Sequence, residues 1–250
     1  MKNSLAEASL SSQFYPMKVT AFFKFIFFSS LFLNLVLLAG MVFTIHRLGG
    51  WKYLLQRLNN PIVALYEHRK QLFEQLPTQN GCIIFLGDSQ IAHCEWQELV
   101  GGDTATVLNR GIAGDYVDGV WARLDEVLRH KPSKIYLLVG VNDLLFQKPL
   151  PAIEARYRDI VQRIRRESPN TALILESLLP VNNDVKNTGV TNTQIQNLNA
   201  RILQIARDYA LQYLDLYTPL TDANGNLATP YTSDGIHLNG KGYKLVKSEK

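Results

Sequence analysis

The chain has 250 residues, 46% of them hydrophobic, which is enough for one domain with a sizeable core and an additional segment. Residues 1–70 carry eight Lys or Arg residues and two acidic residues, a net charge of +6, so the remainder of the chain carries −2. The isoelectric point of about 9.0 therefore derives from the N-terminal part. A slightly acidic body without a basic stripe argues against nucleic acid as a partner.

The N-terminal part contains a long apolar run. Residues 1–18 are polar, and we expect them to be disordered. Residues 25–45 are 21 residues without a charge, and as a helix they would span about 32 Å, the thickness of a bilayer core. We expect a transmembrane anchor over residues 19–46 that meets the membrane through residues 25–45. The alternative, a buried core helix, would need apolar partners on every side.

An uncleaved anchor is favoured over a cleaved signal peptide, because the run exceeds a usual signal core and no clear A-x-A site follows it. The orientation is less sharply marked. Lys18 and Lys24 flank one side of the run, and Arg47, Lys52 and Arg57 flank the other. The positive-inside rule is therefore nearly balanced and leans slightly against export of the body.

Residues 47–79 form a linker between this segment and the body. Asn59 and Asn60 interrupt it, and Pro61 fits the first turn of a helix that runs to about Leu76. We expect two short amphipathic helices here. Their basic and aromatic residues suit a membrane surface or a solvated face equally well.

A regular alternation begins at residue 80 and defines the body, residues 80–250. Near-continuous apolar runs alternate with amphipathic helical patterns, which predicts a parallel sheet covered on both faces. The fold class is therefore α/β, a three-layer α/β/α sandwich with five parallel strands. The expected strands are 82–87, 104–109, 134–140, 171–176 and 211–216, and the expected helices lie near 91–100, 117–130, 152–167 and 193–210.

Small and polar residues follow the expected strands, where such sheets bind their ligands. Three of these segments are Gly87-Asp88-Ser89, Asn109-Arg110-Gly111-Ile112-Ala113-Gly114-Asp115 and Gly140-Val141-Asn142-Asp143, and a fourth, Asp234-Gly235-Ile236-His237, comes near the C-terminus. Each one alone has an ordinary explanation as a helix cap or a turn. Together they supply the parts of a hydrolytic site.

A serine hydroxyl needs an adjacent base to act as a nucleophile, and His237 is a candidate base for Ser89. Asp234 is a candidate to orient the imidazole and stabilise its charged form. Acyl transfer also needs donors for the developing oxyanion, and the N–H groups of Ser89 and Gly111 and the amide of Asn142 are candidates. Ser89 is not in a G-x-S-x-G motif, because Ile91 stands where the second glycine would be.

The four segments, in this order, resemble the motif blocks of the SGNH (GDSL) hydrolase superfamily, most closely its platelet-activating-factor acetylhydrolase-like branch. The resemblance covers residues 80–246. It implies a flavodoxin-like fold with strand order 2-1-3-4-5 and a Ser-His-Asp mechanism that uses neither a metal nor a cofactor. It assigns Ser89, Asp234 and His237 to catalysis, and Ser89, Gly111 and Asn142 to the oxyanion hole.

We therefore expect a membrane-anchored, single-pass serine esterase that hydrolyses short-chain O-acyl esters, such as acetyl esters, of a carbohydrate or lipid. Envelope-associated relatives carry an export or anchor segment, which places the body outside the cytoplasm by analogy. Two alternatives are an O-acyltransferase acting on an envelope glycan with the same triad, and a non-catalytic anchored binding module.

Four residues of the first block region are left open by this interpretation. Gln90 stands where many relatives have an apolar residue or Thr, and His93 lies one helical turn after Ser89, facing either the site or solvent. Cys82 and Cys94 are too few for a disulfide framework or a zinc site. We expect two buried thiols, with a single disulfide as the alternative for an extracytoplasmic body.

Overall fold

A computed structural model describes residues 17–47, 61–102 and 105–248. The chain divides into two compact units, residues 1–54 and 55–250, and each is described by itself. The expectation of disorder for residues 1–18 lies mostly outside the described residues, as does the first of the two expected linker helices. The second linker helix is α3, Pro61–Gln75, and it begins at the proline that the sequence indicated.

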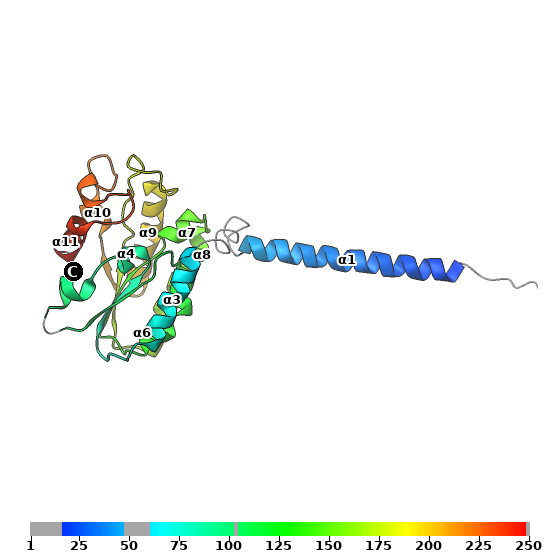
Figure 1. Ribbon diagram of the computed structural model, residues 1–250, viewed down its shortest axis with the longest axis horizontal. Coiled ribbons are helices and arrows are strands. Elements are labelled where there is room, and N and C mark those ends of the chain that lie inside the picture. The colour runs from blue at the N-terminus through cyan, green and yellow to red at the C-terminus, as the bar shows by residue number, and fades with distance from the viewer. Residues whose placement is uncertain (1–16, 48–60, 103–104, 249–250) are drawn as a thin grey trace, which may run out of the picture. The chain divides into compact units, whose positions relative to one another are not determined.

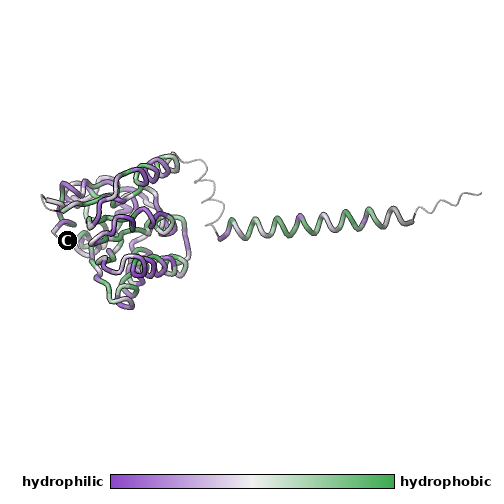
Figure 2. The backbone as a smooth tube through the Cα atoms, turned by 90° about the horizontal axis from the view of Figure 1, so that it is seen from below, coloured by the Kyte–Doolittle hydropathy of each residue, from purple (hydrophilic) through white to green (hydrophobic). Residues whose placement is uncertain are grey.

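The first unit is described as one helix, α1, Met17–Arg47. Within its segment Phe22–Arg47, an 18-residue window has a mean hydropathy of 2.3, and none of that window is buried within the protein. Figure 2 shows apolar residues along most of its length. A helix of this length and composition can cross a membrane, and it fits either an anchor or a signal sequence. A core helix would be mostly buried, and α1 is not.

The second unit is built on a five-stranded parallel sheet with the order β2-β1-β3-β4-β5. The strands are β1 (Ile83–Gly87), β2 (Val107–Gly111), β3 (Lys134–Leu138), β4 (Ala172–Glu176) and β5 (Gln212–Leu214). The fold class and the strand order predicted from the sequence are therefore confirmed. In this order β2 is added on one side of β1, and β3, β4 and β5 are added on the other side. The order of the strands therefore reverses between β1 and β3, and such folds bind ligands at this point.

Helices flank the sheet in the body (Figure 1). Helices α5, α6, α8 and α9 contact one another in one layer, and α10, α11 and η1 make contacts in another. Right-handed crossover connections account for this division. The bounds are α4 (Ser89–Ala92), η1 (Gln97–Gly101), α5 (Val117–Ala122), α6 (Leu124–Leu128), α7 (Val141–Leu145), α8 (Leu150–Glu167), α9 (Asn192–Asp208), α10 (Tyr217–Leu220), η2 (Thr229–Tyr231) and α11 (Gly240–Ser248).

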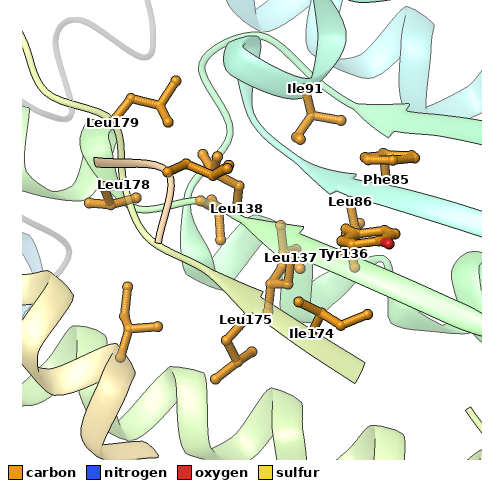
Figure 3. Close-up of a cluster of buried hydrophobic side chains, with 14 of the residues drawn as sticks. Phe85, Leu86, Ile91, Tyr136, Leu137, Leu138, Ile174, Leu175, Leu178 and Leu179 are labelled. Carbon is orange, nitrogen blue, oxygen red and sulfur yellow. The ribbon is translucent and has the colours of Figure 1, made fainter. Parts of the chain in front are cut away.

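The core lies between the sheet and these layers. Apolar side chains of the central strands, such as Leu86, Leu137 and Leu175, are fully buried (Figure 3). Phe85 stacks between Trp96 and Tyr136, with ring centroids 4.0 Å and 4.8 Å away. Burial on both faces explains why these strands read as continuous apolar runs.

Two helical segments differ from the expectation. The pattern over 91–100 forms the short α4 and a separate π-helical turn, η1, and the pattern over 117–130 breaks into α5 and α6 near Arg123. Arg123 is buried, where its guanidinium donates to the Asp115 carboxylate and to the Gly87 carbonyl. A buried side-chain network therefore overrides the local helical pattern.

The two cysteines, Cys82 and Cys94, are buried free thiols. This matches the first of the two expectations. Burial raises the pKa of the Cys82 thiol, which disfavours its reactive thiolate form.

Candidate active site

The register of the sheet gathers the motif segments at one edge. Gly87, the last residue of β1, pairs with Gly111 of β2 and with Leu138 of β3. The segments that begin at Asp88, Ile112 and Val139 therefore leave the sheet side by side. Because parallel strands share one carboxyl edge, residues far apart in the sequence come together there.

Ser89, His237 and Asp234 form a continuous hydrogen-bonded chain. Ser89 Oγ lies 3.0 Å from His237 Nε2, and His237 Nδ1 lies 2.6 Å from Asp234 Oδ2. Ser89 is the first residue of α4, and the other two lie in the loop before α11. This is the geometry that a base-activated serine nucleophile requires.

The carboxylate of Asp234 determines which nitrogen of His237 faces the serine. Its Oδ1 accepts hydrogen bonds from the N–H groups of Ile236 (3.0 Å) and His237 (2.8 Å). Partial burial opposes ionisation, but these bonds and the bond from the imidazole hold the pKa of Asp234 well below its usual range. An ionised Asp234 accepts a hydrogen bond from the Nδ1–H group of His237, which leaves the Nε2 lone pair directed at Ser89.

The main-chain N–H of Ser89 is available at the site. Among the described residues it has no hydrogen-bond acceptor, because it belongs to the first turn of α4. Asp88 caps this turn by accepting the N–H of Gln90 at 3.0 Å. The cap and the nucleophile are therefore adjacent residues, and Ser89 is free of the capping role.

The N–H of Gly111, expected at the oxyanion, is already used. It donates to Asn109 Oδ1 at 2.9 Å, within its own strand. The lack of a side chain at Gly111 serves packing instead, since a Cβ there would lie 2.2 Å from Ala92 N of α4. Gly111 thus allows β2 to approach the backbone of α4 closely.

Gly114 and Asn142 each carry an N–H group that is a candidate donor to the oxyanion. Gly114 has φ of +79°, and its N–H has no acceptor in the part of the chain that the structure describes. Asn142 Nδ2 donates to the Asp115 carbonyl at 2.9 Å, which fixes the amide next to the Gly114 turn and leaves one N–H of Nδ2. The left-handed backbone at Gly114, suited to glycine, turns this loop back toward Asn142.

Buried ion pairs hold the motif segments that follow β2 and β3 in place. Asp143 accepts the Val117 N–H at 3.0 Å and pairs with Lys148 at 2.8 Å. Burial raises the pKa of Asp143 to about 6, against the effect of Lys148. Arg123 and Asp115 form a second buried pair at 2.8 Å. These contacts join the third motif segment to α5 and the second motif segment to β1.

The structure also places the residues that the sequence left open. The side chain of Gln90 is buried, and its amide reaches the loop that carries His237. The ring of His93 is exposed and lies against that of His237, with centroids 4.8 Å apart. Asn109 ties β2 to α4 by donating to the carbonyls of Ile91, Ala92 and Cys94. The position of Gln90 beside Ser89 and that of His93 one helical turn after Ser89 were the sequence signals for the first two of these contacts.

The fold and the site define the class first: an α/β protein with the Ser-His-Asp arrangement of a serine hydrolase at the strand ends. No group of three or more potential metal-ligating side chains occurs within residues 17–47, 61–102 and 105–248. The sequence profile of the GDSL-like lipase/acylhydrolase family matches residues 85–245. The chain belongs to this family.

Individual relatives agree with this membership. A multidomain esterase of Ruminococcus flavefaciens is 27% identical over 128 residues, which is 49% of this chain and 15% of the relative. The chain thus matches a small part of that protein. The structure of a candidate platelet activating factor from Streptococcus pneumonia is 29% identical, with a TM-score of 0.72 over 79% of this chain and 96% of the other.

More distant structures share the fold. The acetylxylan esterase Axe2 from Geobacillus stearothermophilus is 18% identical, with a TM-score of 0.56 over 69% of this chain and 93% of the other.

Proposed function

We propose that the protein is a membrane-anchored serine esterase that removes short acyl groups, such as acetyl, from O-acyl esters of a carbohydrate or lipid. The observation that carries the proposal is the chain from Ser89 Oγ through His237 to Asp234, at 3.0 Å and 2.6 Å. Both distances lie within hydrogen-bond reach, so the base is in contact with the nucleophile before substrate binds.

In the proposed reaction Ser89 Oγ attacks the ester carbonyl while His237 Nε2 takes its proton. The tetrahedral oxyanion is stabilised by the N–H of Ser89 and by the amide of Asn142, and the Gly114 N–H takes the role first assigned to Gly111. His237 then protonates the leaving alcohol. Water, deprotonated by the same nitrogen, releases the acyl group and restores Ser89.

The segment between β4 and α9 supports a short or polar substrate. It borders the loop before α11 that carries Asp234 and His237, which we call the catalytic loop, because Asn182 N donates to the Gly235 carbonyl at 2.7 Å. Residues 183–187 of this segment are exposed and mostly polar, and Asn183 closes it on itself by donating to Val190. Long acyl chains need a continuous apolar surface, and this segment does not offer one.

The apolar helix α1 supports the anchor, and the family analogy supports a body outside the cytoplasm. Residues 1–18 are then an N-terminal tail, 19–46 the anchor, 47–79 the linker and 80–250 the hydrolase domain. A reporter enzyme fused to the C-terminus tests the orientation. Activity of a reporter that works only outside the cytoplasm is the expected result, and activity of a cytoplasmic reporter alone contradicts it.

The serine assignment is tested with the full chain extracted in detergent. We expect Ser89→Ala to abolish both hydrolysis of p-nitrophenyl acetate and labelling by a fluorophosphonate. Ser133→Ala is the matched control, because Ser133 precedes β3 at the opposite end of the sheet. Normal labelling of Ser89→Ala would refute the assignment.

A series of esters with increasing acyl-chain length identifies the acyl group that the enzyme prefers. The same series with a sugar acceptor present shows whether water or the sugar receives the acyl group.

A further inference from the structure

We propose that Gln90 is a positioning residue for His237: its side-chain amide holds the catalytic loop against the helix that begins with the nucleophile. The proposal rests on the proposed function, since it assigns Gln90 a part in the same reaction. Gln90 follows Ser89 directly, so one short segment carries both the nucleophile and the contact that positions its base.

The amide makes a direct hydrogen bond to the catalytic loop. Gln90 Nε2 donates to the Ile236 carbonyl at 2.5 Å, and Ile236 immediately precedes His237 in the chain. The side chain of Gln90 is 4% exposed, so water competes little for this bond. The hydrogen bond joins two residues that are 146 positions apart in the chain. Neither Gln90 nor Ile236 belongs to a strand, so the pairing of the strands does not itself hold them together.

The backbone of Gln90 is also held by hydrogen bonds, so its side chain connects α4 to the catalytic loop from a fixed position. Its N–H donates to Asp88 Oδ1 at 3.0 Å, and its carbonyl accepts the O–H of Tyr243 at 2.8 Å. Tyr243 belongs to α11 and packs edge-on against Trp96, with ring centroids 5.8 Å apart. Gln90 therefore connects the nucleophile turn, the catalytic loop and the helix after that loop.

Packing alone does not explain a glutamine at this position. Its Oε1 is buried without a hydrogen-bond partner among the described residues. The side chain lines a cavity of about 10 Å³ whose other walls are mainly apolar, including Ile91, Leu138 and Leu179. An unpaired buried oxygen is unfavourable, so an apolar side chain of the same length would fill the space at less cost. The amide is accounted for by the hydrogen bond to Ile236.

This argument predicts that activity and stability separate. In Gln90→Met the side chain keeps its length and loses the donor. We expect kcat on p-nitrophenyl acetate and the rate of fluorophosphonate labelling to fall about 10-fold, since misplacing a catalytic group by about 1 Å costs up to about 100-fold. KM and the melting temperature of Gln90→Met should stay close to those of the wild type. Full-length protein in detergent is used throughout.

Gln97→Met is the matched control. Gln97 also forms amide hydrogen bonds, to Ala105 and Val107, but neither of them reaches the loop that carries His237. We expect wild-type kcat in this variant. Wild-type kcat in Gln90→Met, or an equal loss in Gln97→Met, overturns the proposal.

Gln90→Glu gives a second readout that a purely structural role would not change. A protonated carboxyl can donate to the Ile236 carbonyl, and a carboxylate cannot. The titratable neighbours that line the same cavity are Glu176 of β4 and Tyr243 of α11.

The kcat ratio of Gln90→Glu to wild type should therefore fall as pH rises from about 6 to about 9. A constant ratio overturns the proposal. Hydrolysis that survives in Ser89→Ala would instead overturn the proposed function, so the two failures are distinguishable.

Discussion

Asp88 and Asp234 both carry carboxyl groups at the candidate site, and their surroundings shift the pKa values of these groups in opposite directions. Asp234 is partly exposed and accepts hydrogen bonds from His237 and Ile236, which keep it ionised. Asp88 is fully buried. Burial raises the pKa of Asp88 to about 7, the charges of Asp115 and Asp143 act in the same direction, and the N–H of Gln90 opposes them. One carboxylate therefore serves as a permanent charge and the other as a structural cap.

The buried Asp88 predicts a pH dependence of stability. Because its pKa is higher in the folded protein than in the unfolded chain, the folded state binds the proton more tightly. The associated stability is complete below about pH 4 and is lost as pH rises through about 7. In Asp88→Asn the amide oxygen still caps α4, and this loss is absent.

Urea unfolding of both proteins checks the prediction. The free energy of unfolding of Asp88→Asn relative to wild type should rise between about pH 4 and pH 8, with a slope of at most about 1.4 kcal/mol per pH unit. Asp125→Asn, at an exposed carboxylate of α6, serves as the control and should show a smaller slope. A flat difference for Asp88→Asn contradicts the prediction.

At the scale of elements, the strands were predictable and the short helices were not. A strand buried on both faces leaves a continuous apolar run, and all five runs overlap a strand, although β2 begins three residues later and ends two residues later than expected. The end of α4 depends on Asn109 of β2, and the end of α5 depends on Arg123, which follows α5 and donates to Asp115 and Gly87. Such tertiary partners leave no periodic signal in the sequence.

The close approach of β2 to α4 predicts a large effect of one methyl group. In Gly111→Ala the new Cβ would meet the backbone of Ala92, which cannot rotate away as a side chain can. We expect the free energy of unfolding to fall by about 3 kcal/mol, together with loss of activity, because Ser89 lies on the displaced helix.

Gly240→Ala provides the comparison for this test. Gly240 begins α11, and a Cβ there would meet no atom within 4 Å. Equal stability of Gly111→Ala and Gly240→Ala in urea unfolding would show that the packing of β2 on α4 tolerates a side chain.

At the scale of the whole molecule, amino-acid composition alone distinguishes the two units. The charge-free run near the N-terminus predicted α1, and the alternation after residue 80 predicted the body. Ser89 and Asn142 could be predicted as candidate site residues because they follow strands, and Asp234 and His237 because they complete the order of the motif segments. The availability of individual N–H groups was not, because the competing acceptor for Gly111 is a side chain two residues earlier.

The division into units predicts that α1 alone holds the protein at the membrane. A chain that starts at Leu55, the first residue of the second unit, should remain in the supernatant without detergent and keep its kcat on p-nitrophenyl acetate. The physical reason is that α1 carries the long apolar surface. Sedimentation of the truncated protein with membranes would locate a second membrane-binding surface in the body, where Leu65 and Leu72 of α3 are exposed.

The separation of Ser89 and His237 along the chain, 148 residues, has a consequence for refolding. Helices and neighbouring strands form through contacts between nearer segments, and the entropy of loop closure makes the most distant contacts the slowest to form. The Ser89–His237 contact requires that all five strands be in order. During refolding from denaturant, recovery of ester hydrolysis should therefore lag behind the return of the helical circular dichroism signal.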